Sequence, residues 1–314
     1  MIVEPLAVLL QTLLLLLLAP LVTGCIRNWK AKLQNRRGPR IWQPYLDIAK
    51  FLRKDMVISD QASWVFSLAP YVVFLSPLLA GLLVPTVVTA APLSPFGGAL
   101  ALVGLLALGR FVMALGGLDP GSAFGGMGSS REMTIAAMAE PAMMLAIFTV
   151  AISAGSTDLS QMVAAMQGPT SKFLVPTHVM AFAALFIVLL AETGRIPVDN
   201  PATHLELTMI HEAMLLEYSG RYLAFMEWGA SLKQLVLLSV LANIFFPIGI
   251  ANSVLPGALG ISLLAYLGKL LLLAAAVVVV ETTNAKLRLF RVPDLLSAAF
   301  ALATLALLST FLFQ

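Results

Sequence analysis

The chain has little charge and almost no cysteine. Asp, Glu, Lys and Arg make up 11% of its 314 residues, whereas a typical soluble domain contains about 25%. Hydrophobic residues account for 60%, and the mean hydropathy is +0.94. The one cysteine, Cys25, excludes a disulfide within the chain, and it excludes an iron–sulfur cluster or a cysteine zinc site built from this chain alone. This composition indicates an integral membrane protein.

Long apolar runs fill most of the sequence. A membrane-spanning helix needs about 20 mostly apolar residues, and eight segments meet that requirement. We therefore predict an all-α integral membrane protein that forms a single membrane domain over residues 1–314. The fifth span is the shortest, and the sixth and seventh each carry one lysine. The predicted spans are 3–24, 66–90, 98–118, 132–154, 174–192, 228–250, 258–280 and 294–313.

The basic residues lie mostly on one side of these spans. Loop 25–65 holds nine Lys and Arg residues, and the loops after the third, fifth and seventh spans hold seven more. Because basic loops stay in the cytoplasm, both termini are expected on the non-cytoplasmic side of a multi-pass protein of the cell's inner membrane. The charges follow membrane topology rather than forming a basic face with aromatics, so we expect the lipid bilayer, and no nucleic acid, as a partner.

Residues 192–221 concentrate the acidic side chains. They contain five of the sixteen acidic residues and two of the three histidines. Gly194 and Pro197 should end the fifth span, and Asn200 should start a helix over 201–218 that lies at the cytoplasmic interface and ends at Gly220. A metal site is disfavoured, because the histidines lack the HExxH spacing. A line of carboxylates leading into the membrane is favoured over a solvated acidic face. The candidate carboxylates are Glu192, Asp199, Glu206, Glu212 and Glu217.

Four further ionisable residues lie within or at the ends of predicted spans. Such residues are costly in a bilayer and mark functional sites by default. Glu140 precedes Pro141 in the fourth span, and a hydrogen bond that serves packing is its alternative role. Lys233 can extend toward the cytoplasmic interface, whereas Lys269 near the middle of the seventh span needs a partner. Glu281 closes that span, as a relay group or as a solvated end cap.

Two loops have further features. In loop 25–65 the basic turn NRRGPR precedes WQPYLDIAKFLRKD, which predicts a short amphipathic interfacial helix and favours a docking surface for a cytoplasmic partner. Loop 110–131 is rich in glycine but lacks the GK[ST] of a phosphate loop. It predicts a close-packed connection with Arg110, Asp119 and Arg131 available for ion pairs.

Four long motifs resemble one family, the membrane subunit called subunit 1 or H of respiratory NADH–quinone oxidoreductase (complex I). They are NRRGPRIWQPYLDIAKFLRKD, SSREMTIAAMAEP, AETGRIPVDNPATHLELTMIHEAMLLEYSG and ETTNAKLRLFRVPDLL. Complex I subunits tend to read ETNRAPFDLxEGExELVAG where this chain reads ETGRIPVDNPATHLELTMIHEAM. That departure, with GLDPGSAFGGMGSSRE, resembles the anchor subunit of group 4 membrane-bound [NiFe] hydrogenases, including formate hydrogenlyase.

The resemblance implies a membrane anchor and coupling subunit without a catalytic centre or cofactor of its own. Nickel–iron and iron–sulfur centres would belong to hydrogenase-type large and small peripheral subunits, and antiporter-like membrane subunits would complete the pump. The alternatives are a complex I quinone-chamber subunit, a related complex without the nickel–iron site, a passive anchor and a stand-alone transporter. The implied docking residues are Arg36, Arg37, Gly38, Pro39, Arg40, Asp47, Arg195 and Arg221. The implied proton path is Glu140, Glu192, Asp199, Glu206, Glu212, Glu217, Lys233, Lys269 and Glu281.

Overall fold

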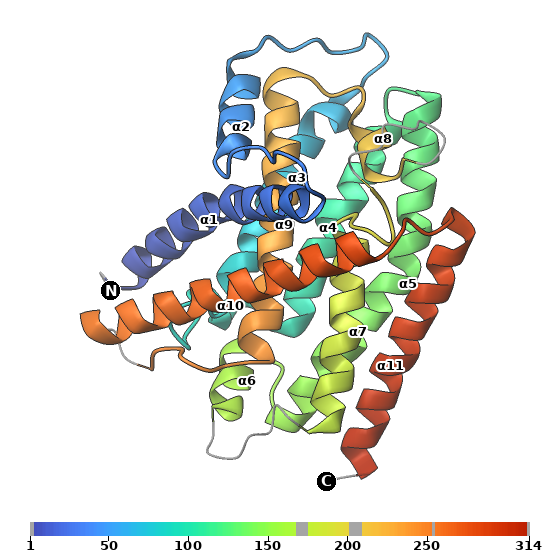
Figure 1. The fold of residues 1–314 in the computed structure, drawn as a ribbon. Helices are drawn as coiled ribbons and strands as arrows, with labels where there is room; N and C mark the ends of the chain where they lie inside the picture. Colours follow the sequence, from blue (N-terminus) through green and yellow to red (C-terminus); the bar gives the residue numbers. More distant parts are fainter. Residues whose placement is uncertain (1–2, 168–174, 201–208, 253–254, 313–314) are drawn as a thin grey trace.

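The fold is a bundle of α-helices (Figure 1). The computed structural model describes residues 3–167, 175–200, 209–252 and 255–312. The helices that match the predicted spans are α1 (Val3–Leu33), α3 (Trp64–Leu83), α4 (Ala99–Leu118), α5 (Ala123–Ala154), α7 (Pro176–Glu192), α9 (Gly220–Ile244), α10 (Pro256–Thr283) and α11 (Val292–Leu312). The shorter helices are α2 (Gln43–Arg53), α6 (Leu159–Met166) and α8 (His211–Leu215), with 3₁₀ turns at Ser94–Phe96 and Leu289–Arg291.

The described residues form an all-helical membrane protein. Within them, 7 helices are long and apolar enough to cross a bilayer, namely α1, α3, α4, α5, α9, α10 and α11. The predicted fifth span corresponds to α7, which is apolar but only 17 residues long. Each predicted span therefore has a helix, although α7 falls below the length of the other seven.

Three helices extend well beyond their predicted spans. Helix α1 continues to Leu33 rather than ending at 24, α5 begins at Ala123 rather than 132, and α9 begins at Gly220 rather than 228. The added turns carry charges that hydropathy assigns to loops. Arg27 and Lys30 in the last turns of α1 pair with Glu227 and Glu281. These ion pairs allow a helix to continue beyond the apolar residues that hydropathy counts as a span. The predicted loop 110–131 is consequently helical except at 119–122, and Arg110 lies inside α4.

The helices pack around one main core. Helix α3 contacts α4 and α9, and α5 contacts α4, α7 and α11. Helices α1 and α10 contact each other and cross the steeper helices obliquely in Figure 1. The α2 and α8 helices lie at the upper end of that view, and α6 and the C-terminus lie at the lower end. The two ends of the bundle therefore carry different elements.

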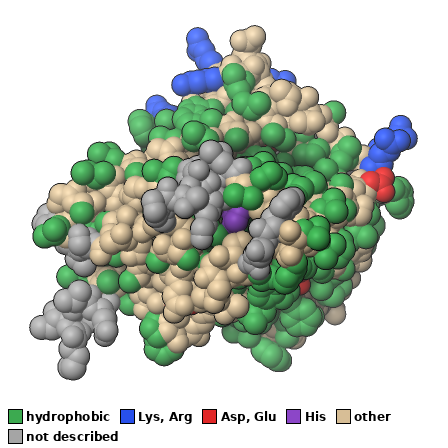
Figure 2. Space-filling view, turned by 90° about the horizontal axis from the view of Figure 1, so that it is seen from below, with side chains coloured by type: hydrophobic (Ala, Val, Ile, Leu, Met, Phe, Trp, Pro, Cys, Tyr) green, Lys and Arg blue, Asp and Glu red, His purple; other side chains and the backbone are tan. Residues whose placement is uncertain are grey.

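The lower end is poor in charge. Figure 2, which views the molecule from below, shows mostly hydrophobic and uncharged polar surface, with Lys and Arg only at its margins. The connections 84–98 and 245–252 at this end contain no Asp, Glu, Lys or Arg. The basic segments 25–65 and 284–291 belong to the other end. This asymmetry agrees with the charge distribution on which the predicted orientation rests.

The predicted helix over 201–218 is wrong for its described part. Residues 201–208 lie outside the described residues, and of the remainder only α8 is α-helical. The backbone groups just before α8 form hydrogen bonds with side chains instead of with a preceding helical turn. The Ile210 N–H donates to the Asp199 carboxylate (3.3 Å), and the Met209 carbonyl accepts from Arg131 (2.8 Å). Gly220, with φ of +52°, begins α9 instead of ending a helix.

Close contacts hold α8 against the bundle. The rings of Tyr218 and Phe66 stack with their centroids 4.0 Å apart. A Cβ on Gly128 of α5 would lie 2.9 Å from the Cβ of Ala213, so only glycine allows this approach. The glycine-rich segment is thus close-packed as predicted, although it is helix rather than loop.

The predicted amphipathic helix in loop 25–65 is confirmed as α2. It begins at Gln43 with Pro44 in its first turn, and it packs against α1 and α9. Its approach to α1 depends on Gly24, because a Cβ there would lie 1.9 Å from the carbonyl oxygen of Ile41. Backbone rather than a flexible side chain occupies that space, so the contact cannot relax locally.

We predict that Gly24→Ala destabilises the protein. Alanine is favoured over glycine by about 1 kcal/mol in a helix, but overpacking against a fixed backbone typically costs about 1–3 kcal/mol. The thermal unfolding midpoint of the purified protein in detergent should fall. Gly104→Ala in α4 is the matched control, since no atom lies within 4 Å of its Cβ position. Equal midpoints for the two variants would contradict the packing described.

Candidate functional site

Arg110 lies at the centre of a buried cluster of charges. Its side chain is 2% exposed, and its guanidinium pairs with carboxylates from two other helices. Nη1 donates to Glu140 at 2.9 Å, Nε lies 3.6 Å from Glu132, and Nη2 bonds Glu192 at the end of α7. Arginine suits this role because its rigid fork presents five N–H donors and stays protonated.

Lys233 of α9 extends this cluster. Its ammonium lies 2.8 Å from the Glu192 carboxylate, so Glu192 is shared between two cations. The cluster, called the Arg110 cluster below, therefore holds two cations and three carboxylates from four helices. Glu192 and Glu132 have side chains 1% and 10% exposed, whereas that of Glu140 is 33% exposed. The cluster thus runs from the interior of the protein to the outer side of α5.

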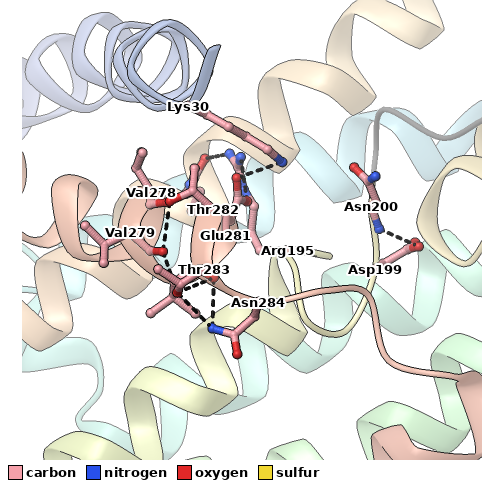
Figure 3. Close-up of polar contacts among 12 residues, drawn as sticks. Lys30, Arg195, Asp199, Asn200, Val278, Val279, Glu281, Thr282, Thr283 and Asn284 are labelled. Carbon is pink, nitrogen blue, oxygen red and sulfur yellow. Dashed lines mark hydrogen bonds and ion pairs between the residues drawn. The ribbon is translucent and has the colours of Figure 1, made fainter. Parts of the chain in front are cut away.

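A second cluster surrounds Glu281 near the end of α10. Its carboxylate lies 3.3 Å from Arg195 and 3.0 Å from Lys30 of α1, as Figure 3 shows. Arg195 also donates to the side-chain oxygen Oε1 of Gln234 at 2.9 Å, and the Thr23 hydroxyl donates to the same oxygen at 3.1 Å. Glu281 is 2% exposed. It is therefore a buried ion-pair partner rather than the solvated end cap that was its alternative.

Asp199 forms a third site in the segment after α7. It pairs with Lys286 at 2.6 Å and accepts the backbone N–H groups of Asn200 and Ile210. A backbone bond from Leu287 to the Pro197 carbonyl (2.9 Å) runs beside this pair. Asp199, which is 4% exposed, thereby ties the segment after α7 to the connection between α10 and α11.

Three adjoining cavities connect these groups. The first, about 180 Å³, lies beneath α2 and is lined by Asp47, Arg27 and Glu227. The second, about 90 Å³, shares Arg27, Glu227 and Ser231 with the first, and it reaches Glu192, Arg195, Asp199 and Gln234. The third, about 30 Å³, shares His211, Ala230 and Lys233 with the second and reaches Arg110 and Glu132. The three cavities therefore adjoin one another between α2 and the Arg110 cluster.

Burial changes the pKa of the groups that line this path outside the spans. Burial, with the Lys233 ammonium, lowers the pKa of His211 to about 4, so this imidazole is neutral at pH 7. Burial, with the nearby Glu227 carboxylate, raises the pKa of Glu212 to about 7. Burial also lowers the pKa of Arg195, an effect that Glu281 opposes. Glu212, with a pKa of about 7, therefore titrates near neutral pH.

The structure gathers many, though not all, of the residues predicted for the proton path. Glu140, Glu192 and Lys233 lie in the Arg110 cluster, and Asp199 and Glu212 line the second cavity. Glu281 lines none of the three cavities but pairs with Arg195, which does. Glu217 is exposed, and Glu206 lies outside the described residues. Lys269 bonds to Asn243 and the Phe246 carbonyl and has no described carboxylate within 4.0 Å.

The residues predicted for docking divide in a similar way. Arg36, Arg37, Arg40 and Arg221 are exposed, together with Pro39, and Gly38 is partly exposed. Asp47 lines the cavity beneath α2. Arg195 is only 7% exposed and points into the protein, where it pairs with Glu281.

Sequence reasoning missed several members of these clusters. Arg110 was expected in a loop and available for ion pairs, and the ion pairs are confirmed although Arg110 lies within α4. Lys30 and Arg27 were counted only as orientation signals, and Glu132 and Glu227 were overlooked. For Arg110 a signal existed, since an arginine within the apolar run 98–118 requires a partner. For Glu132 no comparable signal existed, because it lay at the edge of a predicted span.

The fold and the buried charges define an all-helical membrane protein with a polar interior, and comparisons identify its family. Residues 6–312 match the family model described as NADH dehydrogenase, and the chain belongs to that family. It is 37% identical over 296 residues to hydrogenase-4 component C of Escherichia coli (strain K12), covering 94% of this chain and 92% of the relative. It is 36% identical over 301 residues to formate hydrogenlyase subunit 4 of the same organism, covering 96% and 97%.

Two further comparisons extend this result. An NADH-quinone oxidoreductase subunit of Syntrophotalea carbinolica (strain DSM 2380 / NBRC 103641 / GraBd1) is 32% identical over 250 residues, covering 74% of this chain and 73% of the relative. A chain of the membrane-bound sulfane sulfur reductase, described as an archaeal respiratory membrane complex, superposes with a TM-score of 0.85 at 19% identity. That alignment covers 98% of this chain and 99% of the other, and it confirms the fold.

We predict that Glu212→Gln makes stability less dependent on pH. A carboxyl whose pKa is raised from 4.5 to about 7 contributes stability below pH 4.5 that is lost as the pH rises through about 7. The variant stays neutral, so its unfolding midpoint should match the native protein near pH 4 and exceed it by a few degrees above pH 7. Glu217→Gln, at an exposed position five residues away, is the control. A constant difference at every pH would contradict this account.

Proposed function

We propose that the chain is the membrane anchor and coupling subunit of a redox-driven ion pump of the group 4 hydrogenase or formate-hydrogenlyase type. It docks the peripheral hydrogenase arm and carries a proton path toward the neighbouring membrane subunits. The observation that carries the proposal is the series of adjoining cavities and paired charges from α2 to the Arg110 cluster. The two relatives of 36% and 37% identity, which match over nearly the whole chain, support the choice of complex.

Buried polar atoms beside the cavities support a water-mediated proton path. The Oε1 atom of Glu192 and the Nε2 atom of Gln234 are buried, with no hydrogen-bond partner among the described residues, and both residues line the second cavity. Buried polar atoms in native proteins are nearly always bonded to protein or water. A water molecule needs about 10–15 Å³, so all three cavities admit it. Carboxylates bridged by such waters form a route for protons from α2 to the Arg110 cluster.

The Arg110 cluster supplies the coupling element. Three carboxylates around two cations leave one negative charge that a single proton balances. When one carboxylate takes up that proton, the fixed guanidinium fork keeps its bonds to the others. Glu212 and Glu227 line the second cavity together with Glu192 and Lys233. A charge change at either carboxylate shifts where the proton resides, and redox turnover in the docked arm drives that change.

Partner contacts follow from exposure. The exposed turn around Arg36, Arg37 and Arg40, together with Arg221, forms the docking surface for the large and small hydrogenase subunits. Those subunits would hold the nickel–iron site and the iron–sulfur clusters. The half-exposed Glu140 faces outward from α5 at membrane depth, where a carboxylate is costly against lipid. An antiporter-like membrane subunit is the partner that would receive its proton.

The proposed orientation follows from the charge asymmetry of the two ends. The basic end that carries α2 and α8 faces the cytoplasm, and eight spans, with α7 as the fifth, bring both termini to the opposite side. In this arrangement the cavities open toward the peripheral arm. Glu206 remains in the proposed path on sequence grounds alone, whereas Glu217 and Lys269 lie apart from the connected groups.

A complex I-type role is the second candidate, favoured by the 32% identity to the NADH-quinone oxidoreductase subunit of Syntrophotalea carbinolica. In that case the cavity beneath α2 would belong to a quinone chamber. Assaying the purified complex for hydrogen evolution and for quinone reduction distinguishes the two. Hydrogen evolution without quinone reduction is expected, and the reverse result would replace the first proposal with the second.

We predict that Glu140→Gln and Glu192→Gln each reduce coupled proton transport at least tenfold while leaving redox turnover largely intact. Each variant removes a proton carrier but keeps the size of the side chain. Proton uptake and redox activity of the reconstituted complex provide the measurement, with Asp294→Asn, an exposed carboxylate on α11, as the control. Unchanged transport in both Gln variants would instead identify the chain as a passive anchor.

A further inference from the structure

Lys269 is the buried charge that the proposed function leaves unexplained. It lies near the middle of α10 in sequence, but α10 crosses the bundle obliquely (Figure 1). Its ammonium donates to the carbonyl of Phe246 at 3.0 Å, just beyond the end of α9. Asn243, its other partner, bonds the carbonyls of Pro85 and Thr86, just beyond the end of α3. The ammonium therefore lies level with helix ends at the charge-poor side of the protein, and not at mid-membrane depth.

The position of the ammonium is fixed. Asn243 is fully buried and donates to the carbonyl oxygens of Pro85 (2.8 Å) and Thr86 (2.9 Å). The side-chain oxygen Oδ1 of Asn243 is then left to accept a hydrogen bond from Lys269 at 2.6 Å. An ammonium has three donors, and two have acceptors among the described residues. No described carboxylate within 4.0 Å neutralises the charge.

An apolar crevice opens beside this ammonium. It has a volume of about 420 Å³ and is lined by Phe182, Phe186, Phe246, Leu272 and Ala276, among others. Leu272 is 70% exposed, so the crevice faces the outside of the bundle, where lipid surrounds a membrane protein. Small-molecule sites have volumes of about 300–1,000 Å³ and combine apolar walls with a few fixed polar groups. The crevice and Lys269 have both properties.

We propose that this crevice binds an anionic phospholipid, with an acyl chain along the phenylalanines and the phosphate on Lys269. Three observations favour this occupant. The walls are wholly apolar and include the stem of the Lys269 side chain, its ammonium lacks a carboxylate among the described residues, and that ammonium lies at the level of the helix ends where lipid headgroups are found. A phosphate oxygen accepts the third N–H and supplies the missing negative charge. The site is independent of the proposed proton path, and neither depends on the other.

Titration of the purified intact complex with phosphatidylglycerol tests the proposal, with bound lipid counted by native mass spectrometry. Lys269→Gln removes the charge but keeps a hydrogen-bonding side chain for Asn243. Because a charge-assisted hydrogen bond is lost, its affinity for one phosphatidylglycerol per chain should fall about tenfold. Ala276→Phe keeps the charge and fills the crevice, and it should weaken binding by a similar factor. Phosphatidylcholine should bind more weakly than phosphatidylglycerol to the native protein.

Lys32→Gln is the control, because it makes the same change at an exposed lysine at the other end of the molecule, outside the proposed docking residues. It should leave phosphatidylglycerol binding at this site unchanged. An equal loss in the control, or no loss in either crevice variant, would overturn the proposal. Loss in Lys269→Gln with full binding in Ala276→Phe would also overturn it, since the crevice would then take no part. So would a neighbouring subunit whose carboxylate contacts Lys269 in the assembled complex.

Discussion

The structure depends on the compensation of one buried charge. Arg110 lies in the middle of a helix bundle, where an uncompensated guanidinium would cost several kcal/mol. Helix α5 packs against α4 and brings Glu132 and Glu140 to Arg110, while the side chain of Glu192 reaches it from the end of α7. Removing one partner of such a group typically costs about 3–5 kcal/mol, because the remaining charge stays buried. The same pairing that fixes the helices also assembles the candidate site.

The rest of the polar interior extends from this arrangement. Lys233 links the Arg110 cluster to α9, and the shared cavity walls link it to the groups around Glu281 and Asp199. These contacts explain why segments far apart in sequence, such as the end of α1 and the end of α10, lie together. They also explain why a protein with so little charge keeps a large part of it inside. A passive anchor needs no such series, and this is why we favour a coupling role.

The spans were predictable because bilayer thickness constrains helix length and composition. Helix ends were less predictable, since an ion pair such as Lys30 with Glu281 extends a helix beyond its apolar run. The acidic residues of the site were largely predictable from their cost in a membrane. Ion pairing by Arg110 was predictable too, but its partners were not, because they lie 22 to 82 residues away in the sequence and the contacts are tertiary. The partners of Lys269 were not predictable, because the direction in which α10 crosses the bundle cannot be read from hydropathy.

Arg110 also provides the most direct test of the coupling claim. Arg110→Lys keeps the positive charge but replaces the planar fork with a point charge that cannot hold three carboxylates in place. The decisive measurement is the number of protons transported per electron by the reconstituted complex. The account predicts that this ratio falls severalfold in the variant while redox turnover continues and the complex stays assembled. An unchanged ratio would contradict the claim that the Arg110 cluster couples redox chemistry to proton movement.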